Sequence, residues 1–255
     1  MLDTNLRMTA GFVLALALTG YLMKLTALLV PARSNGTRWL FLFSPLVSPT
    51  SLDRSKPLDH VLSLLLKTLV VSGALLLVYF IYWRLRNKFQ LPALLRSYLK
   101  IPAVYLWGEV LGCYIGLFWS WSGRLLPSVQ NGPLLARGIA DFWSNRWNVW
   151  FSDWFRFVIF NRLRHRPVVG LFVVFGVSGL IHECVVNLPL YLVTGTNLFG
   201  SMMAYFLLQA AGVLLERTVS KTNLRLRVLL AWLVVFVPAP LVINEGLLRA
   251  LQLWR

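Results

Sequence analysis

A histidine inside an apolar stretch is the best candidate for a reacting group in this 255-residue chain. His182 is followed directly by Glu183, and the pair lies in the middle of the apolar run 168–193. An ionisable side chain at membrane depth is costly, so it tends to face a cavity and to have a function. Ser178 and Gly179, one turn earlier, would allow close helix approach or a narrow channel beside the imidazole. The alternative is a structural histidine that hydrogen-bonds to a neighbouring helix.

Other kinds of histidine site fit the sequence less well. A zinc site needs three or four ligands, and no second His or Cys pair lies at a suitable spacing. A serine hydrolase of the G-x-S-x-G type lacks its motif here. His60 borders an apolar run and His165 lies in a basic run, so both are typical of a membrane interface. A proton relay in a transporter stays open, with the other charges in apolar runs as its members: Lys24, Lys67, Glu109 and Glu183.

A second segment, residues 139–156, combines aromatic, amide and charged side chains. On a continuous helix one face would carry Trp143, Trp147, Trp150 and Trp154, and an adjacent polar stripe Asp141, Asn145 and Asn148. An interfacial aromatic belt with arginine anchors explains this composition without any activity. Two asparagines among so many tryptophans are unusual for an anchor, however, because each amide needs partners once it is buried.

The composition places both segments in membrane helices. Hydrophobic residues make up 58% of the chain and charged residues only 13%, with a mean hydropathy of +0.68. A soluble domain carries nearly twice that charged fraction. One crossing takes about 20 apolar residues, and six runs meet this length: 8–30, 61–83, 101–121, 168–193, 198–215 and 228–248. We interpret the first as an anchor, because it is too long for a signal peptide and lacks a cleavage site.

The net charge of +16 indicates membrane topology rather than nucleic acid, because the basic residues lie between apolar runs. The basic segments 122–166 and 216–227 flank two runs joined by an uncharged turn, which predicts that both segments are cytoplasmic. The basic segment 84–100 does not fit simple alternation. We expect a cytoplasmic interfacial helix there, followed by a re-entrant or tilted piece between residues 83 and 121, or else one uncounted span. Irregular backbone within a membrane needs protein or water around it, which indicates an internal cavity.

Together the two polar segments resemble the membrane-bound O-acyltransferase superfamily, and within it the wax-synthase-like branch. Residues 141–148 resemble that branch's asparagine motif, and residues 178–183 resemble its histidine motif, about 35 residues further on. Residues 205–216 are similar to the helix that follows, with Gln209 where many relatives have a histidine. The resemblance covers residues 139–217, within a single integral membrane domain of residues 1–255. Arg146 fits the wax-synthase branch better than the sterol and diacylglycerol branches.

The resemblance implies an all-α polytopic membrane protein, with about six to eight transmembrane helices and re-entrant or interfacial helices around a central cavity. It also implies an enzyme that moves an acyl group from acyl-CoA to a hydroxyl of a lipophilic or amphipathic alcohol, as a wax ester synthase does. His182 would be the general base, and Asn148 would position or stabilise the thioester carbonyl. Acyl-CoA would be a co-substrate, with no bound cofactor and no metal. Glu183 points about 100° away from His182 on a helix, so it is a cavity or interhelical group.

Further side chains are expected to contact the substrates. The substrate-binding candidates are Trp143, Asn145, Arg146, Trp147, Ser178, Gly179, Glu183 and Gln209. Guanidinium groups match phosphate geometry, so the candidates for the phosphates of CoA are Arg156, Arg162, Arg164 and Arg166, although topology alone explains these arginines equally well. The tryptophans would line an acyl or acceptor tunnel, or else form a belt that faces lipid.

Two other functions stay open: a proton-coupled transporter that uses His182, and a non-catalytic membrane scaffold with degenerate motifs. The expected partners are acyl-CoA, an alcohol or lipid acceptor and membrane lipids, with a homo-oligomer also open and nucleic acid excluded. The expected location is a multi-pass position in a bacterial inner membrane rather than the endoplasmic reticulum, with the Arg-rich loops cytoplasmic. The two cysteines, Cys113 and Cys184, are interpreted as small side chains packed between helices.

Overall fold

The computed structural model describes residues 3–30, 38–52, 54, 56–86, 92–219 and 223–253. Within these residues, six helices are long and apolar enough to cross a membrane: Thr4–Leu28, Leu58–Arg84, Ser97–Ser122, Pro167–Thr194, Ser201–Val219 and Leu224–Leu241. Each overlaps one of the six apolar runs, so the prediction of an all-α polytopic membrane protein is confirmed. The physical reason is that a helix satisfies all of its backbone hydrogen bonds internally, as lipid requires.

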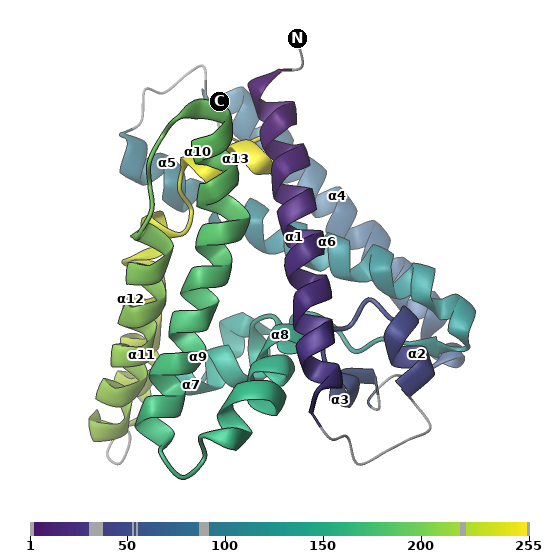
Figure 1. Cartoon of the computed structure of the whole chain (residues 1–255). Coiled ribbons are helices and arrows are strands. Elements are labelled where there is room, and N and C mark those ends of the chain that lie inside the picture. The colour runs from purple at the N-terminus through teal and green to yellow at the C-terminus, as the bar shows by residue number, and fades with distance from the viewer. Residues whose placement is uncertain are drawn as a thin grey trace.

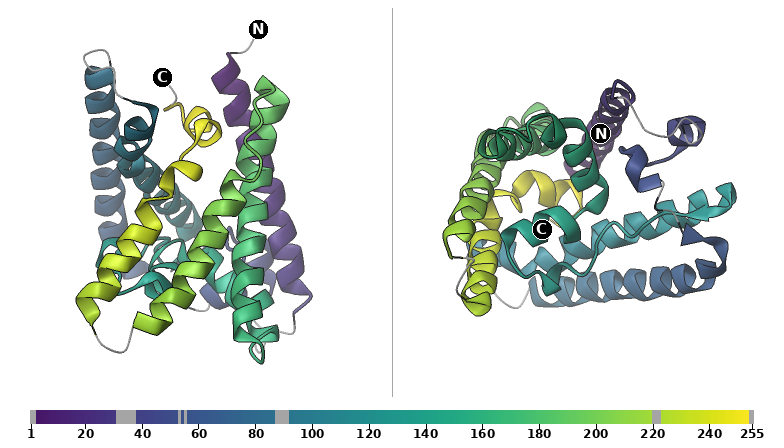
Figure 2. Two further views of the ribbon diagram at one scale, coloured as in Figure 1. Left: turned by 90° about the vertical axis from the view of Figure 1, so that its left-hand side faces the viewer. Right: turned by 90° about the horizontal axis from the view of Figure 1, so that it is seen from below.

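Six α-helices form the body of these spans. They are α1 (Thr4–Leu28), α4 (Val61–Arg86), α6 (Ile101–Trp119), α9 (Pro167–His182), α11 (Ser201–Val219) and α12 (Leu224–Phe236). The fourth span continues from α9 through a π-helical turn, η7 (Glu183–Asn187), into α10 (Leu188–Thr194). Figure 1 shows α4 and α6 as one tilted pair, and Figure 2 shows α9, α11 and α12 gathered on the other side of the molecule.

Short elements fill the space between these groups. The short α-helices are α2 (Arg38–Phe43), α3 (Pro49–Leu52), α5 (Ala93–Leu99), α7 (Ile139–Asp141), α8 (Val149–Trp154) and α13 (Glu245–Ala250). The 3-10 turns are η1 (Leu58–His60), η2 (Ser120–Ser122), η3 (Pro133–Leu135), η6 (Phe160–Arg162) and η8 (Ala239–Leu241), and η4 (Phe142–Arg146) and η5 (Phe155–Ile159) are π-helical. Strands β1 (Lys56–Pro57) and β2 (Arg124–Leu125) pair antiparallel, with Lys56 opposite Leu125.

The chain alternates simply between the two ends of the bundle. In Figure 1 the upper end holds both termini, α5 and α13, and the lower end holds α2, α3, the start of α9 and the start of α12. The basic segments 122–166 and 216–227 thus meet at the same end, as the charge pattern predicts, and Glu216 bonds to both Ala140 and Arg227. Of the two forms expected between residues 83 and 121, the structure has the tilted one, because α6 belongs to a continuous span, Ser97–Ser122, that is tilted in Figure 1. Helix α5, which lies in the basic segment 84–100, is at the opposite end from the start of α9 and the start of α12, so it does not share a side with the other basic segments.

Proline shortens the last span. The apolar run 228–248 predicts one helix, but α12 ends at Phe236, and Pro238 and Pro240 follow. Proline removes a backbone donor and clashes with the preceding turn, so the helix cannot continue. The chain restarts as α13, where the Asn244 side chain accepts a hydrogen bond from the Leu247 N–H at 3.3 Å.

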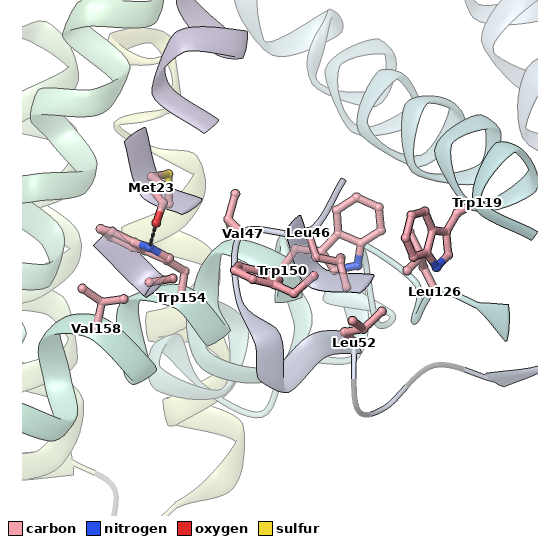
Figure 3. Packing of buried hydrophobic residues seen from close by; sticks show 11 residues of the cluster. Met23, Leu46, Val47, Leu52, Trp119, Leu126, Trp150, Trp154 and Val158 are labelled. Atoms are coloured by element: carbon pink, nitrogen blue, oxygen red, sulfur yellow. Dashed lines mark hydrogen bonds between the residues drawn. The ribbon is translucent and has the colours of Figure 1, made fainter. Parts of the chain in front are cut away.

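The irregular backbone lies in residues 139–162 instead. The expectation of one continuous helix over 139–156 is wrong, because the chain passes from α7 through η4, an extended Trp147 and a left-handed Asn148 into α8. The four tryptophans consequently do not share one face. Trp150 and Trp154 are buried with Met23, and the Trp154 indole N–H donates to the Met23 carbonyl at 2.7 Å (Figure 3).

Candidate active site

His182 is the last residue of α9, and its imidazole is hydrogen-bonded along its own helix. Its Nδ1 lies 2.7 Å from the Ser178 carbonyl oxygen. A carbonyl only accepts hydrogen bonds, so Nδ1 carries the proton, and the neutral ring keeps a lone pair on Nε2. Phe206 of α11 packs against the ring, with centroids 4.5 Å apart. This arrangement leaves Nε2 as the atom that can take a proton.

The backbone changes directly after His182. The helix widens into the π turn η7, a rare geometry that is frequent at functional sites. Glu183, the first residue of the π turn, is buried and points between helices, where its carboxylate accepts from the N–H groups of Gly200 at 2.9 Å and Met203 at 3.1 Å. Gly179 lies against α11, where an added Cβ would come within 3.0 Å of the Met203 Cα. The close helix approach expected at Ser178 and Gly179 is therefore present.

Asn148 lies at the break between η4 and α8 in an unusual backbone conformation. Its φ of 41° and ψ of 64° fall in the left-handed region, which is uncommon for a residue other than glycine. Its backbone N–H donates to the Gln130 side-chain oxygen at 3.0 Å. Among the described residues, its own side-chain amide has no hydrogen-bond partner. Such strained positions persist where the surrounding structure holds them, and they cluster at functional sites.

His182 and Asn148 both line two adjoining cavities. The smaller cavity has a volume of about 210 Å³ and the larger about 1170 Å³. Six residues line both: Trp143, Trp147, Asn148, Phe151, His182 and Phe206. We call this shared wall the junction. It brings an imidazole with a free lone pair and an amide with free donors to the place where the cavities meet.

The smaller cavity follows α9 toward the basic end of the molecule. Its wall includes Leu171, Phe175 and Ser178, so it extends along about 16 Å of helix before His182, at 1.5 Å per residue. Arg156 also lines it, with its guanidinium 2.9 Å from the Ser144 carbonyl. The remaining predicted arginines, Arg162, Arg164 and Arg166, are exposed at the end of η6 and on the loop that leads to α9.

The larger cavity is lined mainly by apolar side chains of α1, α6, α11 and α12. Some of its lining residues also face outward: Val13 and Tyr21 of α1 are 56% and 62% exposed, and Leu111 of α6 is 47% exposed. The cavity therefore reaches the apolar flank of the bundle between α1 and α6. Lys24 also lines it, but its ammonium donates to the Leu42 carbonyl at 2.9 Å and to the Ser44 carbonyl.

The predicted substrate-binding residues fall into two groups. Trp143, Trp147 and Ser178 line a cavity, as does the phosphate candidate Arg156. The others line neither of these two cavities: Asn145, Arg146, Gly179, Glu183 and Gln209. Gln209 is fully buried and instead links two elements, because it accepts from the Trp143 indole N–H at 3.1 Å and donates to the Val234 carbonyl at 2.8 Å.

Arg146 is engaged in an ion pair rather than facing a cavity. Its guanidinium bonds to Asp141 at 2.6 Å. Burial by itself raises the pKa of Asp141, but the hydrogen bonds from the Arg137 N–H, Arg146 and Asn145 outweigh it and lower the pKa below its ordinary value. This ion pair braces η4, the π-helical segment that carries Trp143.

The other charges within the spans have partners of their own. Lys67 of α4 and Glu109 of α6 form an ion pair at 2.7 Å. The Glu183 carboxylate accepts hydrogen bonds from backbone N–H groups. These groups hold helices together, which weakens the case for a proton relay through His182. Within the part of the chain that the structure describes, no group of three or more His, Cys, Asp or Glu side chains could hold a metal ion.

Several cavity residues were not singled out from the sequence. Phe206, Phe151 and Ser152 line the smaller cavity, and Gln130 lines the larger one beside Asn148. Phe206 lies in an apolar helix where its type carries no signal. Gln130 lies in a loop without periodicity, and only its polar character among buried neighbours could have marked it.

These features define a polytopic helical membrane protein with a histidine and an asparagine at the junction of two internal cavities. The membrane bound O-acyl transferase family matches the chain over residues 126–208, a stretch that contains Gln130, Asn148 and His182. Over 65 residues the chain is 42% identical to a probable long-chain-alcohol O-fatty-acyltransferase 9 of Arabidopsis thaliana. That alignment covers 22% of this chain and 19% of the plant protein, so the chain matches about a fifth of that relative's length. The resemblance to the wax-synthase-like membrane-bound O-acyltransferases is confirmed over this stretch.

Proposed function

We propose that this protein is an O-acyltransferase that moves an acyl group from acyl-CoA to the hydroxyl of a lipophilic or amphipathic alcohol. The observation that carries the proposal is the junction, where two cavities of unequal size share His182 and Asn148 in their walls. A reaction between a water-soluble donor and a membrane-dissolved acceptor needs two such entrances that meet at one base. The family match over residues 126–208 supports the same reaction class.

The site residues can perform the transfer in two steps. His182 Nε2 takes the proton of the hydroxyl as its oxygen attacks the thioester carbonyl, which forms the C–O bond and a tetrahedral oxyanion. The Asn148 amide donates to that oxyanion. The C–S bond then breaks, and the leaving thiolate receives the proton from His182. The Ser178 carbonyl holds Nδ1–H throughout, so the ring keeps one tautomer at the start and end of the cycle.

We assign the donor to the smaller cavity. Coenzyme A carries several phosphate charges, and the arginine side chains at this end of the molecule match them in charge and geometry. Arg156 lines the cavity, and the exposed stretch with Arg162, Arg164 and Arg166 continues from it along the chain. We therefore also propose that this end faces the cytoplasm, where acyl-CoA is available. The location in a bacterial inner membrane and the formation of a homo-oligomer stay predictions from the sequence.

We assign the acceptor to the larger cavity. Its walls are mainly apolar, and outward-facing residues of α1 and α6 connect it with the flank that contacts lipid. A long-chain alcohol dissolved in the bilayer can enter there and bring its hydroxyl to His182. The name of the plant relative, a probable long-chain-alcohol O-fatty-acyltransferase, favours the same acceptor and a fatty acyl donor.

The test is ester formation by the purified protein in lipid nanodiscs, with labelled acyl-CoA and a panel of alcohols. Ester should form, and His182→Ala should abolish it while the melting temperature of the protein is kept. His60→Ala is the matched control, because His60 is an exposed histidine in η1, just before α4. Full activity in His182→Ala would overturn the mechanism, and substrate-dependent proton flux in proteoliposomes without ester formation would favour a transporter.

A scaffold function is tested separately from catalysis. The double variant His182→Ala, Asn148→Ala should lose the biological activity of the protein in cells if transfer is the function. Retained biological activity in that variant, at a normal expression level, would favour a non-catalytic scaffold.

A further inference from the structure

The bend that carries Asn148 is hydrogen-bonded to a neighbouring loop, and three of these bonds lie in register along it. The Asn131 N–H donates to the Arg146 carbonyl at 2.8 Å, and the Val149 N–H donates to the Val129 carbonyl at 2.8 Å. Between these two backbone bonds, the Asn148 N–H donates to the side-chain oxygen of Gln130 at 3.0 Å. Residues 129–131 therefore act as a clamp on the bend.

The middle bond differs from the other two because its acceptor is a side chain. Trp147 is extended and Asn148 is left-handed, so the Asn148 N–H does not continue the backbone ladder. The Gln130 side chain supplies the missing acceptor. Gln130 is only 6% exposed and the bond is partly buried, so the Asn148 N–H would lose its protein partner if this oxygen were removed.

The chemistry of the donor also fixes which way the Gln130 amide points. A backbone N–H only donates, so the oxygen must face Asn148 and the nitrogen must face away. Gln130 also lines the larger cavity, on the same wall as Asn148. Among the described residues, Asn148 is the one hydrogen-bond partner of the Gln130 side chain, and the amide nitrogen lies beside Gly108 of α6.

We propose that Gln130 is a positioning residue that holds Asn148 in its left-handed conformation and so aims the Asn148 amide at the junction. The inference rests on the proposed function, because the proposed mechanism uses the Asn148 amide to stabilise the oxyanion. A left-handed residue other than glycine relaxes when its holding contacts are lost. If the Asn148 backbone moved to another allowed conformation, its side chain would leave the junction. A misplacement of about 1 Å at a catalytic group can lower the rate about 100-fold.

The experiment compares two substitutions at one position. Gln130→Met keeps the length of the side chain and removes the acceptor, whereas Gln130→Glu keeps an acceptor oxygen. We expect Gln130→Met to lower kcat by about 10- to 100-fold, with KM for acyl-CoA and alcohol within about twofold of wild type. Gln130→Glu should restore most of kcat. Gln252→Met is the matched control, because it makes the same substitution at an exposed glutamine whose amide bonds to Thr9 of α1 and not to the bend.

A double-mutant cycle separates this inference from the proposed function. If Asn148→Ala leaves kcat unchanged, the proposed role of Asn148 is wrong. If Asn148→Ala lowers kcat, Gln130→Met should add little in that background, because the group that it positions is already gone. Additive losses, or an unchanged kcat in Gln130→Met alone, would overturn the positioning role. Where Gln130→Met does not fold, Gln130→Asn takes its place, since it withdraws the acceptor by one methylene and should give the same loss in kcat.

Discussion

The substitution Glu183→Gln tests whether the carboxylate next to His182 in the chain has a structural or a catalytic role. The wild-type carboxylate accepts three hydrogen bonds: from the Asn187 amide at 2.6 Å, the Gly200 N–H at 2.9 Å and the Met203 N–H at 3.1 Å. It thereby joins η7 to the start of α11. The substituted side chain would keep one acceptor oxygen, so the two N–H groups that share Oε1 can stay paired.

The expected loss of folding free energy in Glu183→Gln follows from the one hydrogen bond that is lost. The amide nitrogen of the substituted side chain would face the Asn187 amide nitrogen, and two donors cannot bond to each other. Asn187 cannot simply flip, because its oxygen already accepts from Asn244 at 3.0 Å. One buried bond to a charged acceptor is therefore broken, which costs about 1–3 kcal/mol of folding free energy. Glu183→Ala would leave all three donors unpaired and should cost more.

The assay measures stability and turnover on the same purified protein. The melting temperature in detergent should fall for Glu183→Gln and fall further for Glu183→Ala, while kcat per folded molecule of Glu183→Gln stays within a few-fold of wild type. Glu109→Gln is the matched control, because its buried carboxylate pairs with Lys67 between α4 and α6 and does not bond to η7. A large loss of kcat in Glu183→Gln at unchanged melting temperature would refute the structural role and assign Glu183 a role in catalysis.

Three further outcomes are expected. Gly20→Trp should raise KM for a long-chain alcohol but not for a short soluble one, because Gly20 lines the larger cavity and an added side chain there would enter open space. Gly73 also faces open space but lies outside that cavity, so Gly73→Trp should change neither KM. Arg156→Gln should raise KM for acyl-CoA several-fold with kcat unchanged, as loss of uniform binding does, and an unchanged KM would count against the donor entrance. The pKa of Asp141 is lowered in the folded protein, so its stabilisation is present above the ordinary value of 3.8 and is lost as the pH falls through the lower folded value. As the pH is lowered from 6 to 3, the melting temperature should therefore fall more steeply for wild type than for Asp141→Asn. Parallel curves of melting temperature against pH would disprove this.

The membrane spans could be predicted because hydrophobicity is a property of each run by itself. Twenty apolar residues in lipid form a helix whatever their neighbours are, since no other structure satisfies the backbone. The boundaries needed one more local signal: Pro238 and Pro240 end α12 before the apolar run is finished. His182 was marked by the same reasoning, because an ionisable group in such a run needs a cavity or a partner.

The arrangement around Asn148 was decided only by tertiary structure. Helical periodicity puts Asn145 and Asn148 on one stripe, yet Asn145 is exposed and bonds to Asp141, while Asn148 faces both cavities. The difference arises because the helix breaks at Trp147, and the break depends on an acceptor from Gln130, 18 residues earlier in the chain. A local pattern carries no information about a partner at that distance. The sequence by itself determined which segments lie in the membrane and that one of them carries a histidine, and the packing of distant loops decided which asparagine shares its cavities.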